Sequence, residues 1–251
     1  MKTLYERDGY LTGIEILSDE EVERYRAEFD AIEQSVGKRA SQVGITNKHK
    51  ENPVLWKLAT HPRILETMRE ILGEDLLLLG THFFCKYPDL NESFVSWHQD
   101  VTYWGLKPAK AATLWLAIDD ADHENGCMRA IPASHRAGQL PHGVANQSGN
   151  LLSVNQEISA DRIDESTAVE LPLRAGQASI HDGLTIHGSC PNHSKNRRRC
   201  GLTLRFTTPD VVPAVGDAKM VQWHPILVSG QDIYRHFQLD SAPQFVAGVI
   251  R

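Results

Sequence analysis

The chain has 251 residues, of which 41% are hydrophobic and 23% are charged, and its formal net charge is −6. This length is enough to bury a sizeable core, whereas no apolar run reaches the ~18 residues of a membrane helix and no basic stretch is long enough for nucleic-acid binding. The four cysteines are widely spaced and form no C-x-x-C pair, so we expect reduced thiols and a cytoplasmic protein.

The first third of the sequence is predicted to be helical. Ser18 and Glu21 have the pattern of a capping box ahead of an amphipathic helix over residues 20–36. A second helix is predicted to begin at Pro62, a favoured first-turn residue, and to end before Gly73. Its apolar residues recur at helical spacing, which predicts that one face packs against a sheet.

Beyond the second helix the pattern changes to short apolar segments separated by Gly, Pro and Asn, which is typical of strands. The predicted strands are 76–79, 82–85, 113–118, 127–131, 168–173, 177–181, 184–187 and 201–207. Asn125-Gly126 is a strong hairpin signal, so 113–118 and 127–131 are expected to pair. The series predicts a mainly β protein with flanking helices, a sandwich or jelly roll.

The chain is predicted to form a single domain over residues 1–251, because no linker or repeat divides it. Residues 134–167 are polar and rich in Gly, Asn, Gln and Ser. A long excursion of this kind in a compact domain is usually functional, so we expect a lid or binding loop there.

The most informative motif is His98-Gln99-Asp100. Side chains two residues apart in an extended segment point the same way, so His98 and Asp100 can bind one ion while Gln99 points elsewhere. His187, far downstream, is the candidate third ligand. Two histidines and one carboxylate that leave other positions open are typical of non-haem Fe(II) oxygenases. His181 is an alternative to His187, but it lacks the Gly-Ser and arginine context that follows His187.

An oxygenase of this kind also needs a cation to hold the carboxylate of its co-substrate. A polar turn follows His187, and arginines open the next predicted strand, which would place a guanidinium beside the metal. Arginine suits this role because its planar fork binds a carboxylate bidentately.

The ordered set of motifs resembles the phytanoyl-CoA dioxygenase family of Fe(II)/2-oxoglutarate oxygenases. The segments that carry the resemblance are 8–10, 97–100, 114–121, 125–128, 131–135, 187–189, 191–192 and the arginine strand. The resemblance implies a double-stranded β-helix, a cupin-like jelly roll with helices outside. It also implies that Fe(II), 2-oxoglutarate and O2 are used to oxidise a C–H bond of a small molecule, with release of succinate and CO2.

Carried over by position, the resemblance implies three iron ligands: His98, Asp100 and His187. Trp115 matches a family tryptophan that packs near 2-oxoglutarate. Two arginines compete for the distal carboxylate of 2-oxoglutarate. The spacing from the histidine indicates Arg198, whereas the alignment of the strand indicates Arg199. We prefer Arg199 because strand register fixes the face of a side chain, while a turn absorbs an insertion.

Weaker candidates surround this set. Thr81 and His82, on the strand before the metal motif, are candidates for the other end of 2-oxoglutarate. The candidate substrate contacts are Trp97, Tyr103, Trp104 and Arg129, with buried packing as the competing interpretation of the aromatic residues. An anionic substrate could use His82, Lys86, Lys110 or Arg129. Arg205 shares strand parity with Arg199 and is interpreted as the partner of a surface acid.

The presence of Asp100 favours hydroxylation or a related oxidation, because related halogenases lack this carboxylate. The alternative is a non-catalytic metal-binding cupin-like protein or sensor, which would not need an arginine beside the metal. A zinc hydrolase ranks last because the sequence has no H-E-x-x-H or comparable base motif. We expect a small-molecule substrate rather than a nucleic acid or a membrane; the sequence predicts neither the substrate nor the oligomeric state.

Overall fold

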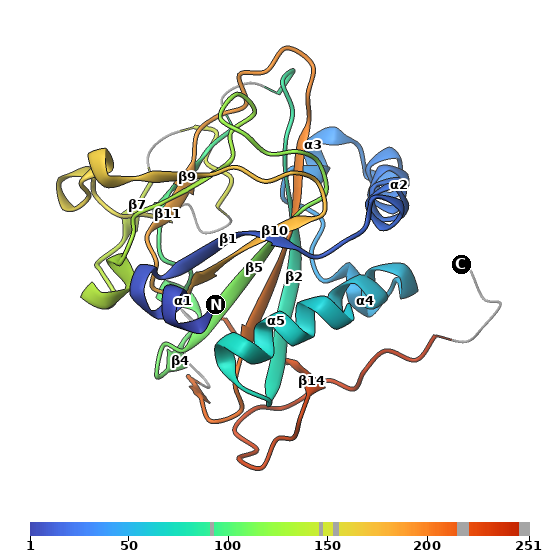
Figure 1. The fold of residues 1–251 in the computed structure, drawn as a ribbon, viewed down its shortest axis with the longest axis vertical. Coiled ribbons are helices and arrows are strands. Elements are labelled where there is room, and N and C mark those ends of the chain that lie inside the picture. Colours follow the sequence, from blue (N-terminus) through green and yellow to red (C-terminus); the bar gives the residue numbers. More distant parts are fainter. Residues whose placement is uncertain (91–92, 146–147, 153–155, 215–220, 246–251) are drawn as a thin grey trace.

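Two antiparallel β-sheets form the centre of the molecule (Figure 1). The structure is a computed structural model that describes residues 1–90, 93–145, 148–152, 156–214 and 221–245, without the side chains of Tyr103 and Gln156. The large sheet has the order β1-β10-β5-β12-β2-β14, with bounds β1 (Tyr10–Glu15), β2 (Leu76–Lys86), β5 (Ala111–Ala117), β10 (Gln177–Asp182), β12 (Arg199–Thr207) and β14 (Ile226–Ser229). The small sheet has the order β3-β11-β6-β9, with bounds β3 (Val95–His98), β6 (Met128–Ala130), β9 (Val169–Leu171) and β11 (His187–Ser189).

Helices cover one side of the large sheet, and the small sheet lies on the other. The α-helices of the described residues are α1 (Lys2–Asp8), α2 (Asp19–Val36), α3 (Lys38–Ser41), α4 (Pro53–Ala59) and α5 (Pro62–Leu72). The 3-10 helices are η1 (Lys48–Lys50), η2 (Asp100–Tyr103), η3 (Ser134–Ala137), η4 (Ala160–Arg162) and η5 (Glu165–Thr167). Two further pairs of short strands are β4 (Leu106–Lys107) with β13 (Val212–Pro213), and β7 (Gly143–Val144) with β8 (Gln156–Glu157). Figure 1 shows α2, α4 and α5 on the side away from β9 and β11.

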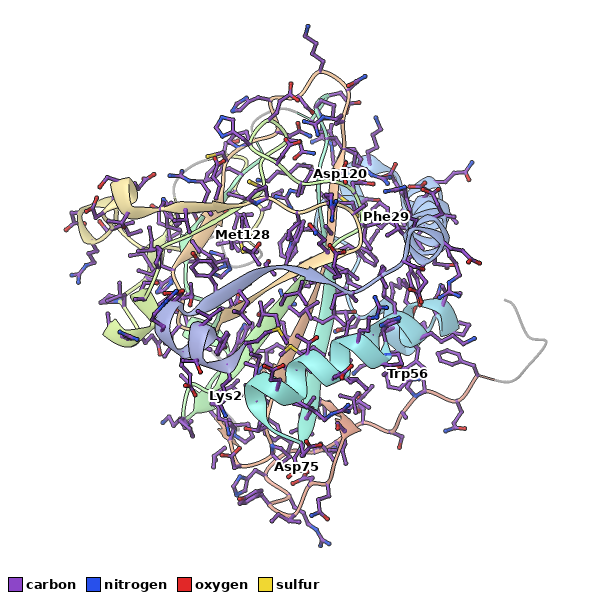
Figure 2. The ribbon with its side chains drawn as sticks, viewed as in Figure 1. Lys2, Phe29, Trp56, Asp75, Asp120 and Met128 are labelled. Carbon is purple, nitrogen blue, oxygen red and sulfur yellow. The ribbon has the colours of Figure 1, made fainter. Side chains whose placement is uncertain are left out.

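The two predicted helices are confirmed. The side chain of Ser18 accepts a hydrogen bond from the backbone of Glu21, whose carboxylate accepts one from the backbone of Ser18, so the capping box of α2 is formed. Helix α5 begins at Pro62 and stops before Gly73. Its apolar stripe is buried in the same core as Phe29 of α2, and side chains fill the interior between helices and sheets (Figure 2).

The predicted strands are largely present, but their pairing differs. Segments 76–79 and 82–85 belong to one strand, β2. The predicted hairpin at Asn125-Gly126 is wrong, because β5 pairs with β10 and β12 whereas β6 pairs with β9 and β11 in the other sheet. The turn residues identify a turn correctly, but long-range packing decides which sheet each strand joins.

The central strand β12 has two chemically different faces because side chains alternate along a strand. Its side chains in the apolar core under the helices are Cys200, Leu202, Leu204 and Phe206. Its side chains that line a cavity between the sheets are Arg199, Thr203 and Arg205. Strands β1 and β14, from the two ends of the chain, form opposite edges of the same sheet; the division of the chain into one domain stays a prediction.

Candidate metal and co-substrate site

His98, Asp100 and His187 lie together in this cavity, with one potential ligand atom of each within 4.8 Å of the others. His98 ends β3, Asp100 begins η2, and His187 is paired with His98 across the two strands. The Oδ1 atom of Asp100 is 3.5 Å from Nε2 of His98 and 3.9 Å from Nε2 of His187. Adjacent ligands about 2.1 Å from one ion are separated by roughly 3 Å, so small rotations would bring all three onto a metal. The predicted strand over 184–187 is wrong, because β11 begins rather than ends at His187.

Hydrogen bonds to carbonyl oxygens orient both imidazoles. Nδ1 of His98 donates to the backbone oxygens of Ser96, at 2.9 Å, and His187, at 3.1 Å. Nδ1 of His187 donates to the backbone oxygen of Thr185 at 3.0 Å. Because a carbonyl oxygen only accepts, each Nδ1 carries the proton and each Nε2 keeps a lone pair for a metal. Burial, together with the charges of the neighbouring histidines, lowers the pKa of His187 well below its usual value, which favours the neutral form that binds metals.

Two further side chains, Thr113 and His181, hold the carboxylate of Asp100. Its Oδ2 atom accepts hydrogen bonds from Oγ1 of Thr113 at 2.6 Å and from Nε2 of His181 at 3.2 Å. Burial raises the pKa of Asp100, but contacts with the surrounding histidines, led by the hydrogen bond from His181, outweigh burial and hold the pKa well below its usual value. His181, predicted only as an alternative ligand, orients the carboxylate instead. Thr113 and His181 face each other on β5 and β10, a pairing that no local motif reveals.

Gln99 points away from the metal residues, as the alternation of an extended segment predicts. Its Nε2 atom donates to the backbone oxygen of Gly138 at 2.8 Å, and its Oε1 atom accepts from the backbone of Leu140 at 2.7 Å. These bonds attach the beginning of the predicted lid, residues 134–167, to the metal motif. Part of this segment lies outside the described residues, and its role as a lid stays a prediction.

Arg199 lies at another end of the cavity, opposite the buried Lys86 in the β12–β2 ladder. Arg199 donates to the backbone oxygen of Gly126 at 3.1 Å and to Oγ of Ser189 at 3.4 Å. Lys86 donates to the same Oγ of Ser189 at 2.6 Å and to the backbone oxygen of Cys190. Burial, followed by repulsion from Arg199, lowers the pKa of Lys86 well below its usual value. No carboxylate of the described residues is paired with either cation, so this end of the cavity is suited to an incoming carboxylate.

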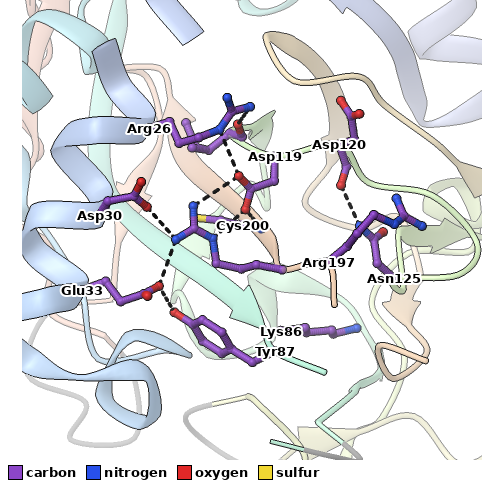
Figure 3. A network of polar contacts seen from close by, with 12 residues as sticks. Arg26, Asp30, Glu33, Lys86, Tyr87, Asp119, Asp120, Asn125, Arg197 and Cys200 are labelled. Atoms are coloured by element: carbon purple, nitrogen blue, oxygen red, sulfur yellow. Dashed lines mark hydrogen bonds and ion pairs between the residues drawn. The ribbon is translucent and has the colours of Figure 1, made fainter. Parts of the chain in front are cut away.

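Arg198 faces away from the cavity, and its prediction as the alternative 2-oxoglutarate contact is wrong. Its guanidinium forms ion pairs with Asp119 at 2.7 Å, Asp30 at 2.6 Å and Glu33 at 3.1 Å; Figure 3 shows these acids in one network. Asp30 and Glu33 belong to α2, so Arg198 ties the helix layer to the sheet. Strand alternation therefore leaves Arg199 as the one of these two neighbours that lines the cavity.

Trp115 lies between the metal residues and Arg199. It lines the cavity from β5, and the guanidinium of Arg199 is 5.3 Å from its ring centre. A Cβ atom at Gly201 on β12 would overlap the indole. The glycine is therefore required for the ring to lie across the neighbouring strand.

Thr81 and His82 do not line the cavity. Thr81 points to the helix side of β2, where its Oγ1 atom is 2.8 Å from Nδ1 of His49. His82 is on the cavity side of the strand, but its Nε2 atom donates to the backbone oxygen of Val43 at 2.6 Å. Their prediction as 2-oxoglutarate contacts is wrong, because neither residue lines the cavity, and Oγ1 of Thr81 and Nε2 of His82 already have partners.

Trp97 and Arg129, predicted as substrate contacts, line a neighbouring surface cleft. The guanidinium of Arg129 is 5.1 Å from the ring centre of Trp97 and 3.5 Å from a carboxylate oxygen of Glu165. This cleft and the main cavity share Val95 and Ser189 on their borders. The two residues are thus placed beside the site, where they could contact a substrate that extends outward.

The main cavity is lined by apolar side chains between its polar ends, including Phe84, Val95, Met128 and Leu152. Trp104, also predicted as a substrate contact, is buried outside this lining and packs edge-on against Trp223 at 5.5 Å between ring centres. The side chain of Tyr103 lies outside the described part of the chain.

Comparison with known proteins identifies the family. The family model described as phytanoyl-CoA dioxygenase (PhyH) matches residues 5–200. The chain belongs to this family. The family predicted from the motifs is therefore confirmed, and the two antiparallel sheets with flanking helices form the expected double-stranded β-helix fold.

Individual members support the same assignment. A probable alpha-ketoglutarate-dependent hypophosphite dioxygenase of Stutzerimonas stutzeri is 27% identical over 186 residues, which cover 72% of this chain and 64% of that protein. The peroxisomal phytanoyl-CoA dioxygenase of Mus musculus is 24% identical over 231 residues, which cover 83% and 68% of the two chains. A solved structure of the non-heme monooxygenase ThoJ, in its apo form, superposes with a TM-score of 0.80 at 30% identity over 97% of this chain and 88% of that one. The chain spans about two thirds of the length of the two curated relatives.

The names of these relatives agree with the predicted oxygenase class and do not favour the non-catalytic alternative. In the part of the chain that the structure describes, no helix has the length and apolar character needed to cross a membrane.

Proposed function

We propose that this protein is an Fe(II)- and 2-oxoglutarate-dependent dioxygenase that oxidises a C–H bond of a small molecule and releases succinate and CO2. The observation that carries the proposal is one cavity with two complementary ends. Two histidines and an ionised aspartate lie at one end. Arg199, which forms no ion pair with a carboxylate of the described residues and lies opposite the buried Lys86, is at the other.

The three side chains of the metal end fit Fe(II). His98, Asp100 and His187 offer two nitrogen atoms and one oxygen atom, and three ligands leave the remaining positions of an octahedral ion open. When bound, iron and 2-oxoglutarate supply the activation of O2 that such oxidations need. The protein's own contribution is the fixed orientation of each ligand, through the carbonyl partners of the imidazoles and through Thr113 and His181 on the aspartate.

The cationic end fits the distal carboxylate of 2-oxoglutarate. Arg199 can present two parallel N–H donors, and the hydroxyl of Ser189 lies within hydrogen-bonding distance of both cations. Trp115 packs beneath the arginine and gives the carbon chain an apolar surface. Asp100 occupies the position that a halide would need, so we infer oxidation rather than halogenation.

An anaerobic titration tests the proposal. Addition of Fe(II) and then 2-oxoglutarate should produce a metal-to-ligand charge-transfer band, and exposure to O2 should release succinate. A protein that binds the metal but gives no 2-oxoglutarate-dependent band would instead be the non-catalytic metal-binding alternative. Screening of small molecules for faster succinate release would then identify the substrate.

We also propose a cytoplasmic location. The four cysteines are free thiols, three of them buried, which is consistent with a reducing compartment.

A further inference from the structure

Arg205 places a second, partly buried guanidinium in the same cavity, beyond the residues that the family model matches. It lies on the same face of β12 as Arg199 but six residues further along, so the two Cα atoms are roughly 20 Å apart at the rise of a strand. Arg205 is paired with Thr113 in the sheet ladder, and Thr113 holds Asp100. It therefore lies on the aspartate side of the metal residues, away from the cationic end assigned to 2-oxoglutarate.

No acidic group among the described residues forms an ion pair with Arg205, so its interpretation as the partner of a surface acid is wrong. Its Nε atom is buried and has no hydrogen-bond partner within the described part of the chain. Its guanidinium lies 5.7 Å from the ring centre of Trp104, whose other neighbour is Trp223. By contrast, Arg198, which directly precedes β12, is surrounded by three carboxylates.

A cation without an ion-pair partner is costly in a poorly hydrated cavity, because burial removes its hydration. Attraction from Asp100 offsets only part of this effect, and the pKa of Arg205 is lowered. A ligand that supplied the missing oxygen atoms would recover this cost. The planar fork of arginine is suited to a compact oxyanion such as a carboxylate or a phosphonate. The distal carboxylate of 2-oxoglutarate is not a candidate, because this short diacid would reach from the metal to Arg199 at the other end.

We propose that Arg205 binds an oxyanion group on the substrate and so selects small carboxylates or phosphonates. This inference rests on the proposed function and specifies the substrate class of the same site. The apolar lining, which includes Phe84 and Leu152, would contact the carbon part of the molecule. The ring of Trp104 lies against the guanidinium of Arg205.

Calorimetry on the anaerobic protein tests the inference, with Fe(II) and 2-oxoglutarate at saturation so that Arg199 is occupied. The probes are butyrate, propylphosphonate and the neutral butyramide, which is matched to butyrate in size. We expect at least one anion to bind 10-fold or more tightly than the amide, and the tighter of the two anions identifies the oxyanion. Equal binding of all three probes, or no anion binding, would overturn the inference without any variant.

Three variants sharpen the test. Arg205→Gln should weaken the preferred anion about 10- to 100-fold, the range expected when a charged hydrogen-bonding partner is lost, and leave amide binding unchanged. Arg205→Lys keeps the charge but loses the planar fork, so its affinity for the preferred anion should lie between those of Arg205→Gln and of the original chain. Arg174→Gln, the same change at an exposed arginine paired with Glu15, is the control and should bind all probes as the original chain does.

The charge-transfer band separates failure of this inference from failure of the proposed function. If Arg205→Gln loses the band, Arg205 serves the metal or 2-oxoglutarate by balancing Asp100, and the inference is wrong. If the band persists but the anion preference is unaffected, the inference is also wrong, while the proposed function stands. A band that is missing from the original chain contradicts the proposed function itself.

Discussion

The two faces of the large sheet differ sharply in chemistry although they share the same strands. On the helix side, β12 contributes apolar side chains to a core that includes Phe29, Met68 and Ile64, all fully buried. On the cavity side, the same strand contributes two arginines, and its neighbours add Lys86, Thr113 and His181.

This contrast indicates that stability and function are divided between the faces. Burial of apolar area is the dominant favourable term in folding, and the helix side supplies it. The cavity side keeps polar and charged groups in a poorly hydrated space, where they cost stability unless paired. Enzymes commonly accept such a cost at their sites.

The largest expected effect is on the cavity side. His98→Ala should abolish both the charge-transfer band and succinate release, because two remaining side chains hold iron too weakly. The control is His123→Ala, at an exposed histidine paired with Glu170, which should keep both signals. Absorption titration and a succinate assay on folded protein provide the measurements. Full activity of His98→Ala would remove the basis of the proposed site.

On the helix side, Phe29→Ala should cost about 3–5 kcal/mol of unfolding free energy, because it leaves a cavity in a fully buried cluster. Denaturant unfolding measures this loss. Affinity for 2-oxoglutarate should stay within about two-fold under conditions in which the variant is folded. Val36→Ala at the exposed end of the same helix is the matched truncation and should change stability by less than about 0.5 kcal/mol. A similar loss in both variants would contradict the division between faces.

The sequence predicted the helix side well because its signals are local. A capping box and a stripe at helical spacing specify α2 and α5 without knowledge of their partners. The metal triad was also predictable, because His98 and Asp100 are neighbours and the context of His187 is distinctive. The preference for Arg199 over Arg198 came from aligning the arginine strand with the family pattern, because strand register fixes the face of a side chain while a turn absorbs an insertion.

The roles of the other polar residues on the cavity side of the sheet could not be predicted, because those roles depend on which strands pair. Lys86 meets Arg199, and His181 meets Thr113, only through ladders that join distant segments. The error at Asn125-Gly126 has the same origin, since a hairpin signal describes a turn but not the destination of the strands that leave it. The role of Arg205 was even harder to predict, because the absence of an acidic partner depends on which residues surround this side chain in the folded protein.

Arg199, the first residue of β12, and its neighbour Arg198 allow the two faces to be compared by the same substitution. Arg199→Gln should weaken 2-oxoglutarate about 100-fold, or about 2.7 kcal/mol, because a bidentate charged contact is lost. Arg198→Gln should change this affinity less than about two-fold but lower the unfolding free energy, because three acids lose their partner. Titration of the charge-transfer band and denaturant unfolding separate the two effects. The reverse pattern would mean that the strand register is shifted by one residue.

His49 is a polar exception on the helix side, and it predicts a pH dependence of stability. Its Nδ1 atom meets Thr81, its ring stacks near Trp56, and burial, with a smaller contribution from Lys50, lowers its pKa from 6.5 to about 4. Between these values the unfolded chain takes up a proton at His49 while the folded chain does not. The free energy of unfolding should therefore fall as the pH is lowered, by about 2 kcal/mol at this residue between about pH 7.5 and 5.

The decisive quantity for His49 is the change of stability with pH, since other buried histidines such as His82 titrate in the same direction. His49→Gln has no titrating group at this position, so its unfolding free energy should fall about 2 kcal/mol less over the same interval. Denaturant unfolding at both pH values gives the difference. Parallel pH profiles for the two proteins would show that His49 is protonated equally in the folded and unfolded chains, and hence that the helix side tolerates a charge at this position.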